Sequence, residues 1–79
     1  MALTREQMIE ILAEADPVGL IEGGAPRDEY AAEADEILSL RGVPQLTEVT
    51  SIFGVSFGEP GACTRETARW IVDEMARRA

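Results

Sequence analysis

The segment from Asp16 to Pro26 constrains the fold of this chain more than any other stretch. It contains three glycines and two prolines, which rule out a regular helix or strand there. An 11-residue connection is long for a chain of 79 residues. Because Val18, Leu20 and Ile21 are apolar, we expect part of this loop to pack onto the core.

A helix is predicted over residues 5–15, ahead of this loop. Thr4 and Gln7 have the spacing of a capping box, in which each side chain accepts from the other residue's backbone N–H. Pro17 disfavours a helical conformation at Asp16, so the helix should end there. The apolar side chains repeat with helical spacing and form one face: Met8, Ile11, Leu12 and Ala15.

Two further helices are predicted from their end signals, over residues 27–41 and 65–78. The first begins with acidic residues, which suit the positive end of a helix dipole, and Gly42 is a natural stop. Thr64 is a typical N-cap for the second, whose last turn carries Arg77 and Arg78.

Residues 45–56 are ambiguous between a helix and a strand. Their apolar residues fall at i, i+3, i+6 and i+7, which favours a helix, although several are β-branched. With this segment as the third helix, the chain has four amphipathic helices and no alternating pattern typical of a sheet. We therefore predict an all-α fold, a small four-helix bundle, as one domain over residues 1–79.

A motif of four residues in and just after this loop has a structural interpretation: Asp16, Pro17, Gly19 and Tyr30. The Asp16 carboxylate can accept backbone N–H groups just beyond it in an Asx-type turn, with Pro17 fixing φ. Gly19 should adopt a backbone conformation that other residues avoid. Tyr30 should bury its ring while its hydroxyl binds Asp16 or a loop carbonyl. A ligand or partner site on the same loop is the alternative.

Three short stretches carry a resemblance to a known family: Asp16-Pro17-Val18-Gly19-Leu20, Gly24-Ala25-Pro26 and Asp28-Glu29-Tyr30, followed by Ile37. Over about residues 14–40 the chain resembles the YugE-like family of small, uncharacterised helical bacterial proteins. In that family Asp-Pro-[Ile/Val]-Gly ends a first helix and Asp-Glu-Tyr opens a second. The resemblance implies an all-α fold and no assigned activity. Ala31 stands where the family often has an acidic residue, which argues against an acidic pair around Tyr30 as a site.

The charge of the chain narrows its partners. Fifteen acidic residues against seven basic ones give a net charge of −8. Such a domain repels phosphate backbones and anionic lipid surfaces, so we expect neither direct nucleic-acid binding nor a membrane partner. The acidity either keeps a small cytoplasmic protein soluble or complements a basic protein partner.

The residue types needed for catalysis are largely missing. The chain has no His and no Lys, which leaves no base for a nucleophile, so we expect no enzyme, no catalytic residue and no cofactor. One cysteine and no histidine offer no zinc site, and no EF-hand spacing is present. Cys63 precedes the N-cap Thr64, so a reactive thiol is one interpretation and packing against Ala68 is the other.

Trp70 departs from the apolar pattern of its helix, because it lies among charged residues on the opposite side from Met75. It either packs beneath residues 16–24 of the same chain or anchors a partner or a second copy. Glu29, Glu33 and Glu36 form an acidic row on the second predicted helix, and Glu6, Glu10 and Glu14 form another on the first.

Two functions agree with these features. The first is a small acidic protein-binding module of inhibitor or immunity type that neutralises a basic partner, with the row Glu29, Glu33 and Glu36 steering association and Trp70 as anchor. The second is a self-associating structural or regulatory protein that buries Trp70, Val55 and Phe57 between copies. We expect a cytoplasmic location, since the start of the chain lacks the pattern of a signal peptide.

Overall fold

The first helix begins and ends where its sequence predicts. Thr4 Oγ1 accepts from the backbone N–H of Gln7 at 3.1 Å, and Gln7 Oε1 accepts from the Thr4 N–H at 2.8 Å. Helix α1 (Arg5–Ala15) follows this capping box and ends at Asp16, whose φ of 45° lies in the left-handed region. In the computed structural model, which describes residues 3–79, three more helices and no strand follow.

Helix α2 (Ala31–Leu38) is shorter at both ends than the predicted 27–41. Ahead of it, Glu29 and Ala31 donate to the carbonyls of Pro26 and Asp28, so this part of the chain forms turns. At the other end the Ser39 hydroxyl donates to the Glu36 carbonyl at 2.6 Å, and the chain leaves the helix there. The acidic residues that favoured an earlier start therefore lie in a turn.

The remaining two helices confirm the helical interpretation of the second half. Helix α3 (Leu46–Phe57) lies one residue beyond the predicted 45–56, because the Glu48 carboxylate accepts from the Gln45 N–H at 2.8 Å and places Gln45 at the N-cap. Helix α4 (Arg65–Arg78) has the predicted limits, and Thr64 Oγ1 accepts from the Thr67 N–H at 3.1 Å. The all-α four-helix fold is therefore confirmed.

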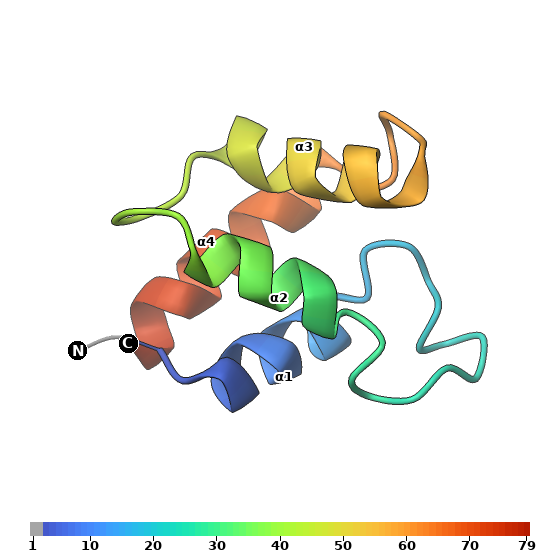
Figure 1. The fold of residues 1–79 in the computed structure, drawn as a ribbon, viewed down its shortest axis with the longest axis horizontal. Coiled ribbons are helices and arrows are strands. Elements are labelled where there is room, and N and C mark those ends of the chain that lie inside the picture. The colour runs from blue at the N-terminus through green and yellow to red at the C-terminus, as the bar shows by residue number, and fades with distance from the viewer. Residues whose placement is uncertain (1–2) are drawn as a thin grey trace.

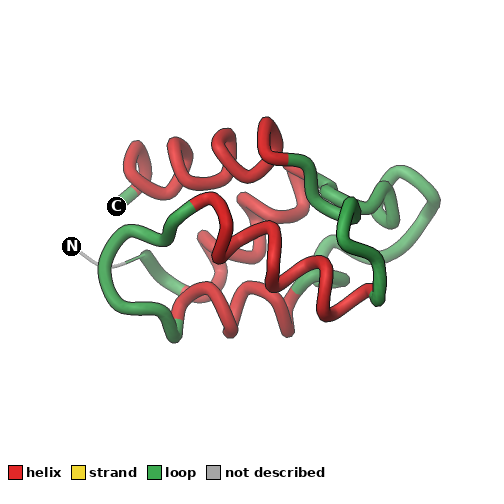
Figure 2. Tube along the Cα trace, turned by 90° about the horizontal axis from the view of Figure 1, so that it is seen from above, coloured by secondary structure: helices red, strands yellow, loops and turns green. Residues whose placement is uncertain are grey.

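Each helix packs against two others: α1 and α3 both contact α2 and α4 (Figure 1). The connection over residues 16–30 and the connection before α4 lie at one end of the molecule. The start of α1, the end of α4 and residues 39–45 lie at the opposite end, as the view from above also shows (Figure 2). The two ends of the molecule are therefore formed by different segments of the chain.

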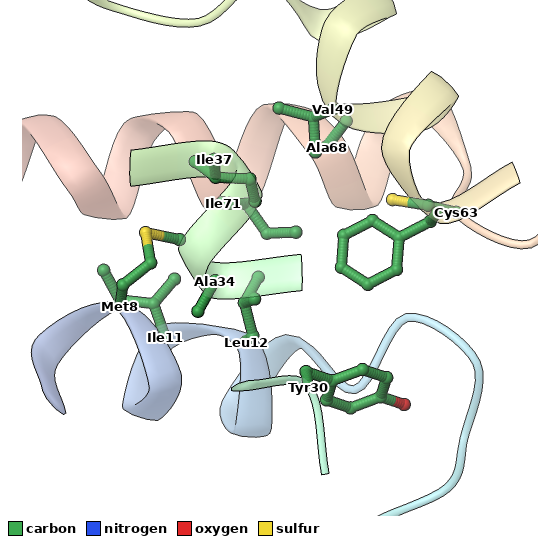
Figure 3. Packing of buried hydrophobic residues seen from close by; sticks show 11 residues of the cluster. Met8, Ile11, Leu12, Tyr30, Ala34, Ile37, Val49, Cys63, Ala68 and Ile71 are labelled. Atoms are coloured by element: carbon green, nitrogen blue, oxygen red, sulfur yellow. The ribbon is translucent and has the colours of Figure 1, made fainter. Parts of the chain in front are cut away.

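The core joins all four helices and is shown in Figure 3. Met8, Ile11 and Leu12 of α1 point towards Ile37 and Ile71, and all five are at most 1% exposed. The fully buried residues of the wider cluster also include Tyr30, Ala34, Val49, Phe53 and Ala68.

An aromatic cluster closes the core beside the 16–30 connection. The rings of Tyr30 and Phe53 meet edge to face at 5.9 Å, and Phe53 stacks on Phe57 at 6.2 Å. Phe57 also meets Tyr30 at 6.1 Å and is half-buried. Phe57 therefore packs against the core with part of its ring, and offers less exposed apolar surface than Val55 or Trp70.

Burial predicts the cost of two conservative substitutions. Ile71→Val removes one methylene from a fully buried site and should lower the free energy of unfolding by about 1 kcal/mol. Val55→Ala changes a residue that is 81% exposed and should stay within about 0.5 kcal/mol of the parent chain. Urea unfolding followed by circular dichroism measures both, and equal effects would contradict the packing described above.

Candidate functional site

The motif residues Asp16 and Tyr30 form one hydrogen-bond network. The Tyr30 hydroxyl donates to Asp16 Oδ1 at 2.6 Å and accepts from the N–H groups of Val18 and Leu20, both at 3.3 Å. In Figure 3 this hydroxyl points away from the core, towards the loop after α1. The predicted bond between Tyr30 and Asp16 is confirmed.

The Asp16 carboxylate organises the loop more widely than an Asx turn does. Oδ1 accepts from the Ile21 N–H and Oδ2 from the Glu22 N–H, both at 3.0 Å. The carboxylate therefore binds amides that lie five and six residues further along the chain. The prediction that it binds amides just beyond Asp16 is wrong in that detail, because the chain first turns at Gly19 and then returns. Gly19 has a φ of 75°, which confirms its predicted conformation.

Protonation in this pair follows from the network. Partial burial raises the pKa of the Asp16 carboxyl, but the bonds from Tyr30 and from the Glu22 and Ile21 amides outweigh it, and the net pKa lies below its ordinary value. Burial, followed by the bond to Asp16, raises the pKa of Tyr30. Carboxylate and phenol therefore keep their neutral-pH states, and the pair stabilises the loop rather than exchanging protons.

This network makes Asp16 and Gly19 sensitive to substitution. Asp16→Ala leaves the Tyr30 hydroxyl and two amides without their acceptor, and Gly19→Ala forces a side chain into a positive φ, although no atom obstructs its Cβ. Each should lower the free energy of unfolding by about 1–2 kcal/mol. Thermal and urea melts measure this.

Gly61→Ala is the matched control, since its Cβ also meets no atom and its φ is not positive. It should leave the melting midpoint unchanged or slightly higher. A control variant as unstable as Gly19→Ala would refute the conformational explanation.

The expected acidic row of Glu29, Glu33 and Glu36 does not form. Glu29 lies in the turn before α2 and is exposed, whereas Glu33 is only 7% exposed. Glu36 is exposed on α2. The row assumed a helix from residue 27, and the later start of α2 leaves Glu29 outside the helix. Glu33 lies one helical turn before the buried Ile37 and shares its inward face. These three residues offer two separate exposed charges.

The second row, on α1, is partly neutralised by α4. Arg78 contacts Glu14 at 3.0 Å, Glu10 at 3.9 Å and Glu74 at 2.9 Å, and its side chain is 19% exposed. Arg77 also contacts Glu74, at 2.7 Å. The spacing of Glu74 and Arg78 was visible in the sequence, but their link to α1 depends on how the two helices pack.

The Arg77–Glu74–Arg78 group gives stability a defined pH dependence. Hydrogen bonding from Arg77, with a further bond from Arg78, lowers the pKa of Glu74 from 4.5 to about 2 despite some desolvation. A depressed carboxyl pKa stabilises the fold above the unfolded value, and this contribution disappears as pH falls from about 4.5 towards about 2.

We expect Glu74→Gln to be less stable than the parent chain at pH 7 and to approach it as the solution is acidified through this window. Urea unfolding at a series of pH values tests this. Glu59→Gln, at an exposed carboxylate with no ion pair within residues 3–79, is the control. A constant difference between Glu74→Gln and the parent at all pH values would contradict the assignment.

Cys63 is a packing residue. It is 2% exposed and belongs to the same buried cluster as Ala68. Burial raises the pKa of the thiol to about 11, so it stays protonated at neutral pH. The interpretation of Cys63 as a reactive thiol is therefore wrong, and packing against the core is confirmed.

Trp70 borders a shallow hollow between the end of α1 and the start of α4. This hollow, here called the Trp70 hollow, has a volume of about 500 Å³ and is lined by Glu14, Ala15, Thr64, Glu66, Thr67 and Trp70. No residue from 16–24 lines it, and Trp70 remains 39% exposed. That loop therefore does not line the hollow beside the exposed part of the Trp70 ring, and packing of the ring beneath residues 16–24 and contact with a partner both stay predictions.

A second concavity, which the sequence analysis missed, lies at the end formed by the start of α1 and the end of α4. This apolar groove has a volume of about 360 Å³, and its lining includes Leu3, Leu38, Leu40, Val43, Val72 and Met75. Val43 is 74% exposed. The apolar residues at 38, 40 and 43 were a signal, but they lay inside or beside a helix predicted to continue to residue 41.

Over residues 3–79, no three His, Cys, Asp or Glu side chains gather in a way that could hold a metal ion. None of the helices described is both long and apolar enough to cross a bilayer. Comparison with family models, curated proteins and solved structures found no match to this chain. The resemblance to the YugE-like family therefore stays a prediction.

Proposed function

We propose that this chain is a small acidic protein-binding module, of inhibitor or immunity type, that neutralises a basic partner. One observation carries the proposal: among the exposed residues that form no ion pair within residues 3–79, carboxylates outnumber arginines. Within residues 3–79, Arg5, Arg77 and Arg78 are paired, Arg5 to Asp35 at 2.7 Å. The exposed arginines without a pair are Arg27, Arg41, Arg65 and Arg69.

The exposed carboxylates without an ion pair in the same part of the chain are more numerous: Glu6, Glu22, Asp28, Glu29, Glu36, Glu48, Glu59, Glu66 and Asp73. Several of them lie on the two connections that share one end of the molecule in Figure 1. Such an excess raises the association rate with a basic protein and lowers it with an acidic one. Trp70, exposed and on the side of α4 that faces the end of α1, supplies an anchor of the kind that dominates binding energy.

A tagged pull-down from native lysate at low salt tests the proposal, with partners identified by mass spectrometry. We expect one basic protein near one-to-one stoichiometry, released at high salt. The double variant Glu29→Arg, Glu36→Arg should slow association with it about tenfold at low salt. Recovery of partners that are not basic, or an unchanged association rate, would refute the proposal.

Self-association is the second candidate, and the apolar groove favours it. A second copy would bury Val43 and the other apolar residues of the groove, because exposed apolar patches tend to mark contact sites between proteins. Light scattering on the purified chain separates the two candidates. Recovery of the bait alone, at twice its monomer mass, would support this second candidate, whereas a monomer at high concentration would remove it.

A further inference from the structure

The exposure of Trp70 is not required by the packing of its own helix. The side of α4 that faces the core is already occupied by Ala68 and Ile71, both fully buried. Trp70 lies outside that face, and leaving a large aromatic ring 39% exposed forfeits part of the free energy that its burial would supply. A side chain in this state is available for contact with another molecule.

The polar groups around this ring share one chemical character. Glu66 is exposed, lies one helical turn before Trp70 and has no ion pair among residues 3–79. Glu14 of α1 faces the same hollow, where Arg78 already holds one side of its carboxylate. The two threonine hydroxyls of the lining bond to each other at 2.9 Å. The lining therefore combines a partly exposed aromatic ring with carboxylates, and none of its residues is basic.

This combination matches one type of side chain. A guanidinium is planar, so it can stack on an indole face while its N–H groups, which lie in the guanidinium plane, donate to a carboxylate at its edge. A lysine ammonium is a point charge that is more strongly hydrated and cannot stack in this way. We infer that the Trp70 hollow takes an arginine side chain of the basic partner, with Glu66 as the principal carboxylate. This inference rests on the proposed function and names the contact through which it acts.

The single tryptophan of the chain makes the inference directly measurable. A short oligo-arginine peptide, blocked at both ends, is titrated against the purified chain while the fluorescence of Trp70 is recorded. We expect a saturable change, weaker binding of the matching oligo-lysine peptide and no binding of the neutral citrulline peptide. Equal affinity for the arginine and lysine peptides, or no saturable change, would overturn the inference.

Two variants locate the contact. Glu66→Gln should weaken oligo-arginine binding about two- to fivefold, the range of an exposed charge pair. Trp70→Leu keeps an apolar side chain but removes the ring face, and calorimetry should show a similar loss. Glu59→Gln makes the same charge change at an exposed residue outside the hollow and should bind nearly as the parent does. Equal weakening by Glu66→Gln and Glu59→Gln would show attraction by net charge alone and would overturn the inference.

The failure of this inference is distinguishable from the failure of the proposed function. If the lysate yields a basic partner but Glu66→Gln binds it as the parent does, the proposed function stands and the arginine contact is wrong. If no basic partner is recovered while oligo-arginine still binds through Glu66 and Trp70, the contact stands and the proposed function is wrong.

Discussion

The hydrogen bond between the Tyr30 hydroxyl and the Asp16 carboxylate is the interaction on which the rest of this structure depends. Asp16 ends α1 in a left-handed conformation, and Tyr30 occupies the N-cap of α2. The same pair therefore defines one limit of each helix and holds the connection between them against the core. Because the Tyr30 ring also meets Phe53 of α3, one side chain links three of the four helices. A loop rich in glycine and proline becomes ordered here because the Asp16 carboxylate and the Tyr30 hydroxyl together accept from four of its amides.

The sequence predicted most where the signals are local. The starts of α1 and α4 follow from Thr4 and Thr64, whose hydroxyls accept from amides in the first turn of their own helices. The limits of α2 could not be found in this way. Its apolar and acidic pattern extends over residues 27–41, but the helix starts only after Tyr30, whose side chain is committed to a residue 14 positions earlier. Long-range contacts therefore override a favourable local pattern.

The candidate site also divides into features set by nearby residues and features set by the packing of helices. Asp16, Gly19 and Tyr30 were predictable because the loop motif contains all the groups that bind one another. The exposure of Trp70 beside α1 depends on how α1 and α4 pack, as does the bond from Arg78 to Glu14. The assumed row of Glu29, Glu33 and Glu36 failed for a related reason, because a helical wheel is informative only within the true limits of its helix. Glu33 left the row for a different reason, because it shares the inward face of α2 with the buried Ile37.

The placement of Leu3 and Ala79 has a mechanical consequence. Leu3 and Ala79 line the same groove, so the first and last described residues lie on one end of the molecule, while the 16–30 connection and the connection before α4 lie at the other (Figures 1 and 2). A tether attached beside Leu3 or Ala79 would leave the Trp70 hollow facing outwards. Tension applied across the two ends would act first on the contact between α1 and α4, and would separate Glu14 from Arg78 before it reached the aromatic cluster.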